Sequence, residues 1–306
     1  MTILKRIIKS KFVQSLKIIK IVYYPLYQSA VNKFNFNVAS PLKTVETIEK
    51  NDLSLGRFGD GEMRIMFQHG NIGFQKYDSD LAQELFEAAT SSKEYAIALP
   101  HGFLSTRSDN LRTSVFWWKY TFENRNNINK FVESSLTNSF LDTNFSRTVT
   151  ELKDKDNIDK VIHSVKNLWE NRTVLMVEGD QTKFGVGNDL LDNAKKIHRV
   201  IGPAVNAYSA IDDLESSIME LNQKISNPLI LVALGPTATV LVHRLALKGV
   251  QAIDIGHFDL QYEYYLRGAF HRVNVANKYD NELGTTGNAG NKKNHKYEEE
   301  IYKRFL

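Results

Sequence analysis

The sequence predicts an α/β fold in which a mostly parallel sheet is flanked by helices on both faces. From residue 173 onward, short apolar segments alternate with amphipathic ones, as is typical of strands joined by helical crossovers. The segment PLILVALG at 228–235 is apolar almost throughout, as expected for a strand buried on both faces of a parallel sheet. The chain has 306 residues, enough to bury a sizeable hydrophobic core.

The N-terminal half is expected to begin the same pattern. Helices are predicted where apolar residues recur at helical spacing, and strands where short apolar runs end at glycine or proline. The helices are expected at 41–50, 62–70 and 78–92, and the strands at 52–59 and 94–100. The aromatic, charge-mixed middle segment at 105–172 is predicted to be mostly helical.

The C-terminal half carries the clearest alternation. The strands are expected at 173–179, 198–204, 228–235 and 250–256, and the helices at 188–197, 210–225 and 236–249. A polar, Gly/Asn-rich stretch at 281–296 is predicted to be a mobile loop, and 297–306 a terminal helix. We therefore divide the chain into a basic amphipathic segment at 1–40, one α/β domain at 41–280, and a polar loop with a C-terminal helix at 281–306.

The composition narrows the class of protein. There is no cysteine, which excludes structural disulfides, thiolate metal sites and cysteine nucleophiles, and is compatible with a reducing, cytoplasmic location. The net charge of +4 combines +8 in residues 1–43 with −4 in residues 44–306. The mildly acidic body argues against a nucleic-acid-binding core.

The N-terminal segment sets lysines against apolar residues at helical spacing, among them Ile3, Ile7, Phe12 and Leu16. It lacks the uninterrupted run of roughly 18 to 20 apolar residues that a membrane span needs, and it has no signal-peptide layout. Two interpretations stay open. The basic helix lies on the anionic inner face of a membrane as a peripheral contact, or it packs its apolar face on the body of a cytoplasmic protein.

Candidate site residues gather at four predicted strand ends, where ligands bind in open parallel sheets. The four are RFGDGE at 57–62, EGD at 178–180 followed by GVGND at 185–189, GPTAT at 235–239, and DIGH at 254–257.

The first strand end places two carboxylates around a glycine turn. Asp60 and Glu62 flank Gly61 and can hold a hard divalent cation, while Arg57, two residues before Gly59, can pair with a phosphate. A metal, a diphosphate and an arginine together indicate a nucleoside-diphosphate donor. The structural alternative is a capped helix start, with Asp60 as the cap and Glu62 near the positive end of the helix dipole.

The second and third strand ends are rich in glycine, which lets a backbone approach a ligand closely. The candidate phosphate contacts are Gly185, Gly187, Asn188 and Asp189 in the second, and Gly235, Pro236 and Thr237 in the third. Free N–H groups at a helix N-terminus would favour a phosphate at the third. Neither segment matches the Walker or G-x-G-x-x-G pattern, so an ordinary strand-to-helix turn is the alternative for both.

Three side chains are candidates for a catalytic base: Glu178, Asp254 and His257. A carboxylate and an imidazole at one strand end can act as a base and its orienting partner, or as metal ligands. The alternative is structural, with Asp254 capping a turn and His257 bonded to a backbone group.

Long segments of the chain resemble the bacterial GT-D type glycosyltransferases. The resemblance is carried by SLGRFGDGE, the WW pair of the helical middle, VEGDQTKFGVGNDLLDNAKKIHRVIGPAVNA and ALGPTATVLVHRLALKGVQAIDIGHFDLQYEYY, and covers about residues 40–280. It implies a Rossmann-like parallel sheet, a UDP-sugar donor, typically with glucose, and a D-x-E motif, here Asp60 and Glu62, that acts with Mn²⁺ or Mg²⁺. One departure is Lys183, where the resemblance leads us to expect the bidentate fork of arginine.

The sequence therefore predicts a metal-assisted glycosyltransferase that moves a sugar to a hydroxyl of a glycan, glycoprotein or lipid-linked acceptor in bacterial surface-glycan synthesis. Trp117 and Trp118 are candidates to line the acceptor groove. Two alternatives stay open. A Rossmann-type NAD- or SAM-dependent enzyme would use Asp254, which falls 19 residues after Gly235. A non-catalytic partner of a glycosylation complex would bind the UDP-sugar without turning it over.

Overall fold

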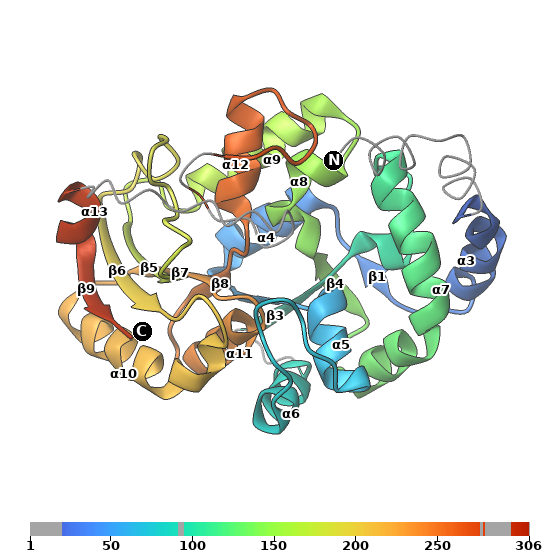
Figure 1. Ribbon diagram of the computed structural model, residues 1–306, viewed down its shortest axis with the longest axis horizontal. Helices are drawn as coiled ribbons and strands as arrows, with labels where there is room; N and C mark the ends of the chain where they lie inside the picture. Colours follow the sequence, from blue (N-terminus) through green and yellow to red (C-terminus); the bar gives the residue numbers. More distant parts are fainter. Residues whose placement is uncertain (1–19, 91–94, 276–277, 279–294, 306) are drawn as a thin grey trace, which may run out of the picture.

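Within the residues that the structure describes, nine strands form one sheet through the middle of the molecule (Figure 1). This computed structural model describes residues 20–90, 95–275, 278 and 295–305. The strands are β1 (Asn37–Val38), β2 (Ser54–Arg57), β3 (Tyr95–Leu99), β4 (Ser139–Asp142), β5 (Thr173–Gly179), β6 (Lys196–Gly202), β7 (Leu229–Ala233), β8 (Ala252–Asp254) and β9 (Ile301–Arg304). Their order is β1-β4-β3-β2-β8-β7-β5-β6-β9, and neighbouring strands run parallel. The predicted fold class is confirmed.

Helices cover both faces of this sheet. They are α3 (Tyr23–Val31), α4 (Pro41–Asn51), α5 (Asp60–Gln68), α6 (Ser79–Ala88), α7 (Leu111–Ser134), α8 (Thr148–Glu151), α9 (Lys155–Asn167), α10 (Ile211–Lys224), α11 (Pro236–Ala246), α12 (Phe258–Leu266) and α13 (His295–Glu300). Figure 1 shows α4, α8, α9 and α12 on one side of the sheet and α5, α6, α10 and α11 on the other. The α3 helix packs against α7.

Two hydrophobic clusters, one on each face of the sheet, form the core. Successive residues of β5 alternate between them, with Leu175 and Val177 on the side of α10 and α11, and Val174 and Met176 on the side of α4 and α9. All four side chains are fully buried. This two-sided burial explains why the strands read as uninterrupted apolar runs.

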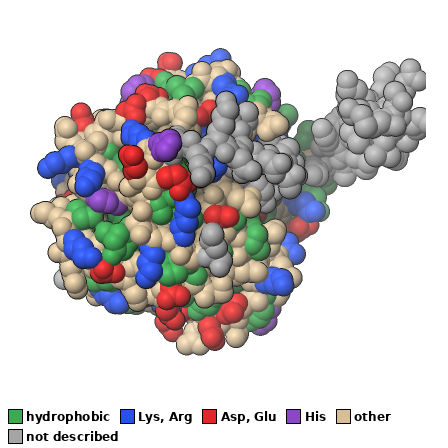
Figure 2. All heavy atoms as spheres, turned by 60° about the vertical axis from the view of Figure 1, so that its left-hand side comes forward, with side chains coloured by type: hydrophobic (Ala, Val, Ile, Leu, Met, Phe, Trp, Pro, Cys, Tyr) green, Lys and Arg blue, Asp and Glu red, His purple; other side chains and the backbone are tan. Residues whose placement is uncertain are grey.

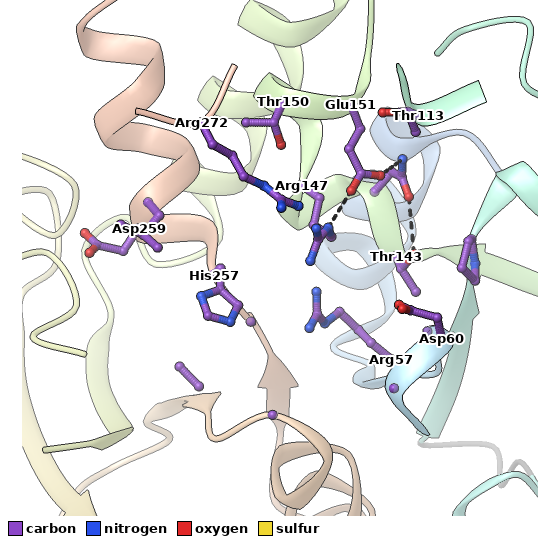
Figure 3. Close-up of a pocket in the computed structure, with 18 of the residues that line it drawn as sticks. Arg57, Asp60, Thr113, Thr143, Arg147, Thr150, Glu151, His257, Asp259 and Arg272 are labelled. Atoms are coloured by element: carbon purple, nitrogen blue, oxygen red, sulfur yellow. Dashed lines mark hydrogen bonds and ion pairs between the residues drawn. The ribbon is translucent and has the colours of Figure 1, made fainter. Parts of the chain in front are cut away.

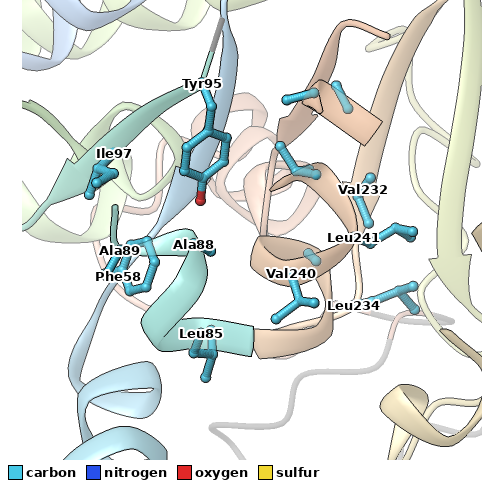
Figure 4. Packing of buried hydrophobic residues seen from close by; sticks show 14 of the residues in the cluster. Phe58, Leu85, Ala88, Ala89, Tyr95, Ile97, Val232, Leu234, Val240 and Leu241 are labelled. Atoms are coloured by element: carbon cyan, nitrogen blue, oxygen red, sulfur yellow. The ribbon is translucent and has the colours of Figure 1, made fainter. Parts of the chain in front are cut away.

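The Tyr95 ring illustrates how tightly this core is packed. Figure 4 shows it among buried side chains that include Leu85 of α6 and Val240 of α11. Its hydroxyl lies against Gly56 of β2, where a Cβ would overlap it. Gly56 is therefore needed for packing, because any side chain there would displace the ring.

One of the predicted helices is wrong, and the predicted C-terminal helix is helical only as far as Glu300. Residues 188–195 form turns, in which Asn188 Oδ1 accepts a hydrogen bond from the Leu190 N–H (3.1 Å), and β6 begins at Lys196. Such local side-chain bonds compete with a helix. At the C-terminus, the predicted helix ends at Glu300 and β9 follows, because the edge of β6 offers backbone groups that a strand can bond.

The middle segment is helical as predicted in α7, α8 and α9, but it also contains β4, and β1 precedes it. Neither strand was predicted, since two and four residues are too few to show an apolar alternation. The helix predicted around Ile3 and Leu16 and most of the loop predicted at 281–296 lie outside the described residues.

The surface of the body mixes charges of both signs. On the face shown in Figure 2, basic and acidic side chains are interspersed. Among the helices of the described segments, none has the length and apolar character that crossing a membrane requires.

Candidate functional site

A cavity of about 830 Å³ opens at the carboxyl ends of the strands. It lies over the ends of β2, β3, β4, β5, β7 and β8, through Arg57, Pro100, Thr143, Gly179, Gly235 and Gly256. It also lies over the neighbouring strands β5 and β7, from which the chain continues in opposite directions, β5 to β6 and β7 to β8. Ligands bind at such switch points, and this volume suits a small-molecule site.

Arg57, the last residue of β2, is fixed on several sides. Its Nε lies 3.1 Å from Asp254 Oδ1, and its Nη1 donates a 2.7 Å hydrogen bond to the Ser146 hydroxyl. Gly256 has a φ of +52°, and a Cβ there would overlap the guanidinium. The guanidinium therefore enters the cavity in one fixed orientation (Figure 3).

Asp254 lies behind Arg57 rather than in the cavity. It is fully buried, its Oδ1 also accepts the Gly256 N–H at 3.1 Å, and the Thr239 hydroxyl lies 3.2 Å from its Oδ2. Burial raises the pKa of Asp254, and the Arg57 charge opposes that shift. The structure thus gives Asp254 the role of positioning Arg57, and does not bring this candidate base or ribose ligand to the cavity.

The first turn of α5 brings Asp60 and Glu62 to the cavity. Gly59 is the N-cap, and its N–H donates to Glu62 Oε2 at 2.7 Å, so Glu62 closes a capping box. Burial raises the pKa of Glu62 to about 7, although the Arg57 charge opposes it. Asp60 is exposed, and Figure 3 shows its side chain beside Arg57.

The carboxylates of Asp60 and Glu62 suit a divalent metal ion whose remaining ligands come from a bound phosphate and water. In the described part of the chain, no group of three or more His, Asp or Glu side chains is arranged to hold a metal ion. Mg²⁺ and similar cations are commonly held by one or two carboxylates, with substrate phosphates and water completing the shell. Asp60, together with the second oxygen of Glu62, fits that pattern.

Two further arginines point into the same space, and no motif predicted them. Figure 3 shows the guanidinium groups of Arg57, Arg147 and Arg272 converging, with His257 facing them. Arg147 Nε is held by Glu151 Oε1 at 2.6 Å, and Glu151 Oε2 accepts the Asn144 side-chain N–H at 2.8 Å. The i,i+4 spacing of Arg147 and Glu151 was the one sequence signal available.

Of the three candidate bases, His257 alone lines the cavity, at the start of α12. Glu178 is fully buried, with Oε1 2.7 Å from Arg199 Nη1 and Oε2 accepting the Phe184 N–H at 2.6 Å. Arg199 also pairs with Glu300 of α13 at 2.7 Å. Glu178 therefore ties β5 to β6 and the C-terminal segment, away from the cavity.

The glycine-rich turn at 185–189 supports α12 instead of facing the cavity. The Gly185 N–H donates to Asp259 Oδ1 at 2.9 Å, and the Asn188 side chain donates to Glu263 at 2.8 Å. Asp189 accepts the Tyr262 hydroxyl at 2.8 Å. Gly185, Gly187 and Asn188 line a separate cavity of about 290 Å³, and Lys183 lines neither cavity.

The turn before α11 contributes through Gly235. This residue has a φ of +58° and lines the cavity, and a Cβ there would overlap the ring of Phe74. Pro236 and Thr237 are buried in the first turn of α11 and do not line the cavity. Only the first of the three predicted contacts in this turn thus reaches the site.

The two tryptophans of the middle segment differ. Trp117 lines the cavity but is only 5% exposed. The Trp118 indole N–H donates to the Thr106 hydroxyl at 2.9 Å, and its ring meets Tyr24 edge-on. Trp118 does not line the cavity, so it joins α7 to α3 rather than forming an acceptor groove.

Parallel strands covered on both faces, with a cavity at their carboxyl ends, define an α/β protein of the Rossmann-like class. The chain belongs to the glycosyltransferase GT-D fold family, whose model matches residues 55–283. The family resemblance inferred from the sequence motifs is thereby confirmed.

Solved structures share this fold. A structure described as the highly conserved domain of unknown function 1792, with a distinct glycosyltransferase fold, has a TM-score of 0.84 at 32% identity, over 93% of this chain and 100% of that one. A structure described as a new glycosyltransferase from Streptococcus sanguinis has a TM-score of 0.81 at 30% identity, over 89% and 100%.

Two curated relatives come from streptococci. The "Probable glycosyl transferase Gly" of Streptococcus gordonii is 34% identical over 248 residues, which are 80% of this chain and 35% of the relative. "Glycosyltransferase GlyD" of Streptococcus pneumoniae serotype 4 is 32% identical over 243 residues, 78% of this chain and 29% of the relative. The chain thus spans about a third of the length of these relatives.

Proposed function

We propose that this chain transfers a sugar, typically glucose, from a UDP-sugar to a hydroxyl of a glycan, glycoprotein or lipid-linked acceptor in bacterial surface-glycan synthesis. The observation that carries the proposal is the convergence of Arg57, Arg147 and Arg272 beside Asp60 at the carboxyl ends of the strands. The guanidinium groups of these arginines can bind a diphosphate through paired hydrogen bonds. The Asp60 carboxylate beside them can bind a metal ion that the diphosphate also coordinates. Membership of the GT-D family supports a nucleotide-sugar donor.

In this proposal the nucleoside lies over β5 and β7, at the switch point, and the diphosphate lies among the arginines. Asp60, with Glu62, holds a divalent metal, Mn²⁺ or Mg²⁺, which when bound would neutralise charge on the leaving diphosphate. The arginines add to that neutralisation from fixed positions. His257 faces the same space and is the base we assign if the reaction inverts the anomeric centre.

The alternative of an NAD- or SAM-dependent enzyme loses its main support. Asp254, whose spacing from Gly235 suggested a ribose ligand, is buried against Arg57 and does not line the cavity. A non-catalytic binding role makes a different prediction from transfer, because the UDP-sugar would then bind without being consumed.

The test is a screen of UDP-sugars and other nucleotide sugars for metal-dependent hydrolysis, with Asp60→Asn and Glu62→Gln beside the wild type. We expect UDP-glucose to be hydrolysed and Asp60→Asn to lower the rate about a hundredfold, because a metal ligand is lost. Asp80→Asn is the matched control, since Asp80 also lies in the first turn of a helix but outside the cavity. Equal rates in wild type and Asp60→Asn would remove the metal role, and binding without turnover would favour the non-catalytic partner.

A further inference from the structure

One side of the cavity, next to β4 and the start of α7, is not used by the UDP-sugar in the proposed binding mode. Its lining residues are Asn110, Arg112, Thr113, Phe116, Lys153 and Lys155. We call these six residues the α7 wall. Figure 1 shows α7 beside β1 and β4, in the half of the sheet away from β5 and β7.

The α7 wall is built from two segments that are bonded to each other. The Asn110 N–H donates to the Glu151 carbonyl at 2.9 Å, and the Lys153 N–H donates to the Ser108 carbonyl at 3.0 Å. Asp109 and Leu152 form a β-bridge between them. The wall therefore has its shape without a ligand.

A buried imidazole anchors this wall to the sheet. His101 Nδ1 lies 2.6 Å from Asp142 Oδ2 at the end of β4, and its Nε2 lies 2.5 Å from Asp109 Oδ1. Burial alone would lower the pKa of His101, but Asp142 and Asp109 raise it to about 11. The His101 imidazolium thus pairs with both carboxylates, and its charge offsets the negative charge of Asp109 next to the wall.

Phe116 is the exposed aromatic of this wall. Its side chain is 45% exposed, while Trp117 and Tyr120 pack against it with ring centroids 4.8 and 5.8 Å away. A ring that is supported on one side and open on the other suits the apolar face of a sugar. Arg112 precedes Phe116 by four residues and so lies on the same face of α7.

The charge of the wall is positive. Arg112, Lys153 and Lys155 are exposed, and Lys155 Nζ lies 4.5 Å from the ring centre of Phe270. The nearby carboxylate of Glu151 is already bonded through both oxygens, to Arg147 and to Asn144. The wall therefore presents three positive charges to the cavity, and the exposed carboxylates beside its lysines, Asp154 and Asp156, do not line the cavity.

We propose that the α7 wall is the acceptor subsite, and that it binds a saccharide that carries a phosphate or a carboxylate. A sugar ring stacks on Phe116, and Arg112, Lys153 and Lys155 bind the negative group. This inference rests on the proposed function, because an acceptor site has meaning only beside a donor site.

The test uses the 306-residue chain saturated with UDP and the diamagnetic Mg²⁺, so that the donor side is filled. Glucosyl phosphate, methyl glucuronide and methyl glucoside are titrated by ligand-observed NMR, and the two acidic sugars show whether phosphate or carboxylate is preferred. We expect the preferred acidic sugar to bind about tenfold more tightly than methyl glucoside. Phe116→Ala and Arg112→Gln should each weaken that binding about tenfold, and Phe116→Tyr should restore it.

Phe86→Ala is the matched control, because Phe86 is also a partly exposed aromatic but lies on α6, outside the cavity. Equal affinity for the neutral sugar, or binding that Phe116→Ala leaves unchanged, would overturn the acceptor subsite. Competition between UDP and glucosyl phosphate would also overturn it, since both would then occupy the donor side. If UDP itself fails to bind, the donor proposal falls, and the same titrations without UDP still decide whether the α7 wall binds acidic sugars.

Discussion

Arg57 shows how a buried carboxylate can serve a site without touching a ligand. Asp254 and Ser146 hold its guanidinium from behind, and Gly256 leaves the room that it needs. The arginine is therefore oriented before any anion binds, which is the condition for strong electrostatic stabilisation.

Arg57→Lys tests this arrangement. Lysine keeps the positive charge, but it lacks the planar guanidinium whose separate nitrogens contact Asp254 and Ser146 at the same time. We expect kcat/KM for the UDP-sugar to fall about a hundredfold, with the circular dichroism spectrum unchanged. Arg125→Lys is the control, because Arg125 lies on α7 outside the cavity. Activity near the wild-type level in Arg57→Lys would show that the fixed fork is not needed.

Glu62→Gln tests the pKa shift at the same site. Burial raises the pKa of Glu62 from 4.5 to about 7, so the folded chain binds a proton in this interval that the unfolded chain has released. Stability therefore falls as the pH rises through this interval, and ionised Glu62 destabilises the fold above it. Glutamine still accepts the Gly59 N–H but carries no charge.

We accordingly expect the melting temperature of Glu62→Gln, relative to wild type, to rise between about pH 5 and about pH 8. Thermal unfolding at several pH values checks this, with Glu123→Gln, an exposed residue of α7, as the control. A variant that loses stability relative to wild type as the pH rises would contradict the assigned shift.

At the residue scale, the short motif at 57–62 predicted which side chains of this strand end lie at the cavity, and their chemistry stays a proposal. Arg57, Asp60 and Glu62 line the cavity as expected. Glu178 and Asp254 also end strands, and a sequence pattern cannot separate a carboxylate that faces a ligand from one that faces an arginine behind the strand. Arg147 and Arg272 carry no motif, because only the tertiary fold brings them together.

At the scale of elements, pattern length decided what could be predicted. The long apolar strands β5 and β7 appear in the sequence at nearly their observed bounds. The short strands β1 and β9 do not, because their pairing depends on neighbours that are distant in the sequence. The turns at 188–195 mimicked a helix, since buried Leu190 and Leu191 sit among polar residues.

Gly56→Ala tests the packing of β2 against β3. The added Cβ would overlap the Tyr95 hydroxyl, so we expect a loss of about 2–4 kcal/mol in the free energy of unfolding. That hydroxyl has no hydrogen-bond partner among the described residues, so Tyr95→Phe should cost little. The double variant should recover part of the loss. Urea unfolding measures all three, and additive losses would contradict the assigned clash.

At the scale of the whole molecule, the sheet separates the proposed roles. We propose that the half around β5 and β7 receives the nucleoside, that the arginine cluster binds the diphosphate, and that the α7 wall receives the acceptor. The net positive charge of the chain comes from residues 1–43, while the remaining residues sum to −4. A membrane contact through residues 1–40 would bring the enzyme to a lipid-linked acceptor, and it remains a proposal.

Vesicle sedimentation tests that contact on the 306-residue chain. We expect binding to phosphatidylglycerol vesicles to fall about tenfold or more when four N-terminal lysines become glutamine, since each contributes about 1 kcal/mol near an anionic surface. The four are Lys5, Lys9, Lys11 and Lys17. The control replaces four exposed lysines of the body, Lys50, Lys130, Lys160 and Lys195. Equal binding by both variants and the wild type would exclude the contact.

The central claim is that the strand-end cavity binds a nucleotide-sugar donor through a metal held at Asp60, and calorimetric titration of UDP tests it most directly. We predict that the wild type binds UDP in Mn²⁺ and that chelation of the metal weakens binding about tenfold or more. Asp60→Asn should lose this metal dependence, and Asp80→Asn should keep it. Full metal dependence in Asp60→Asn, or binding of NAD without binding of UDP, would contradict the claim.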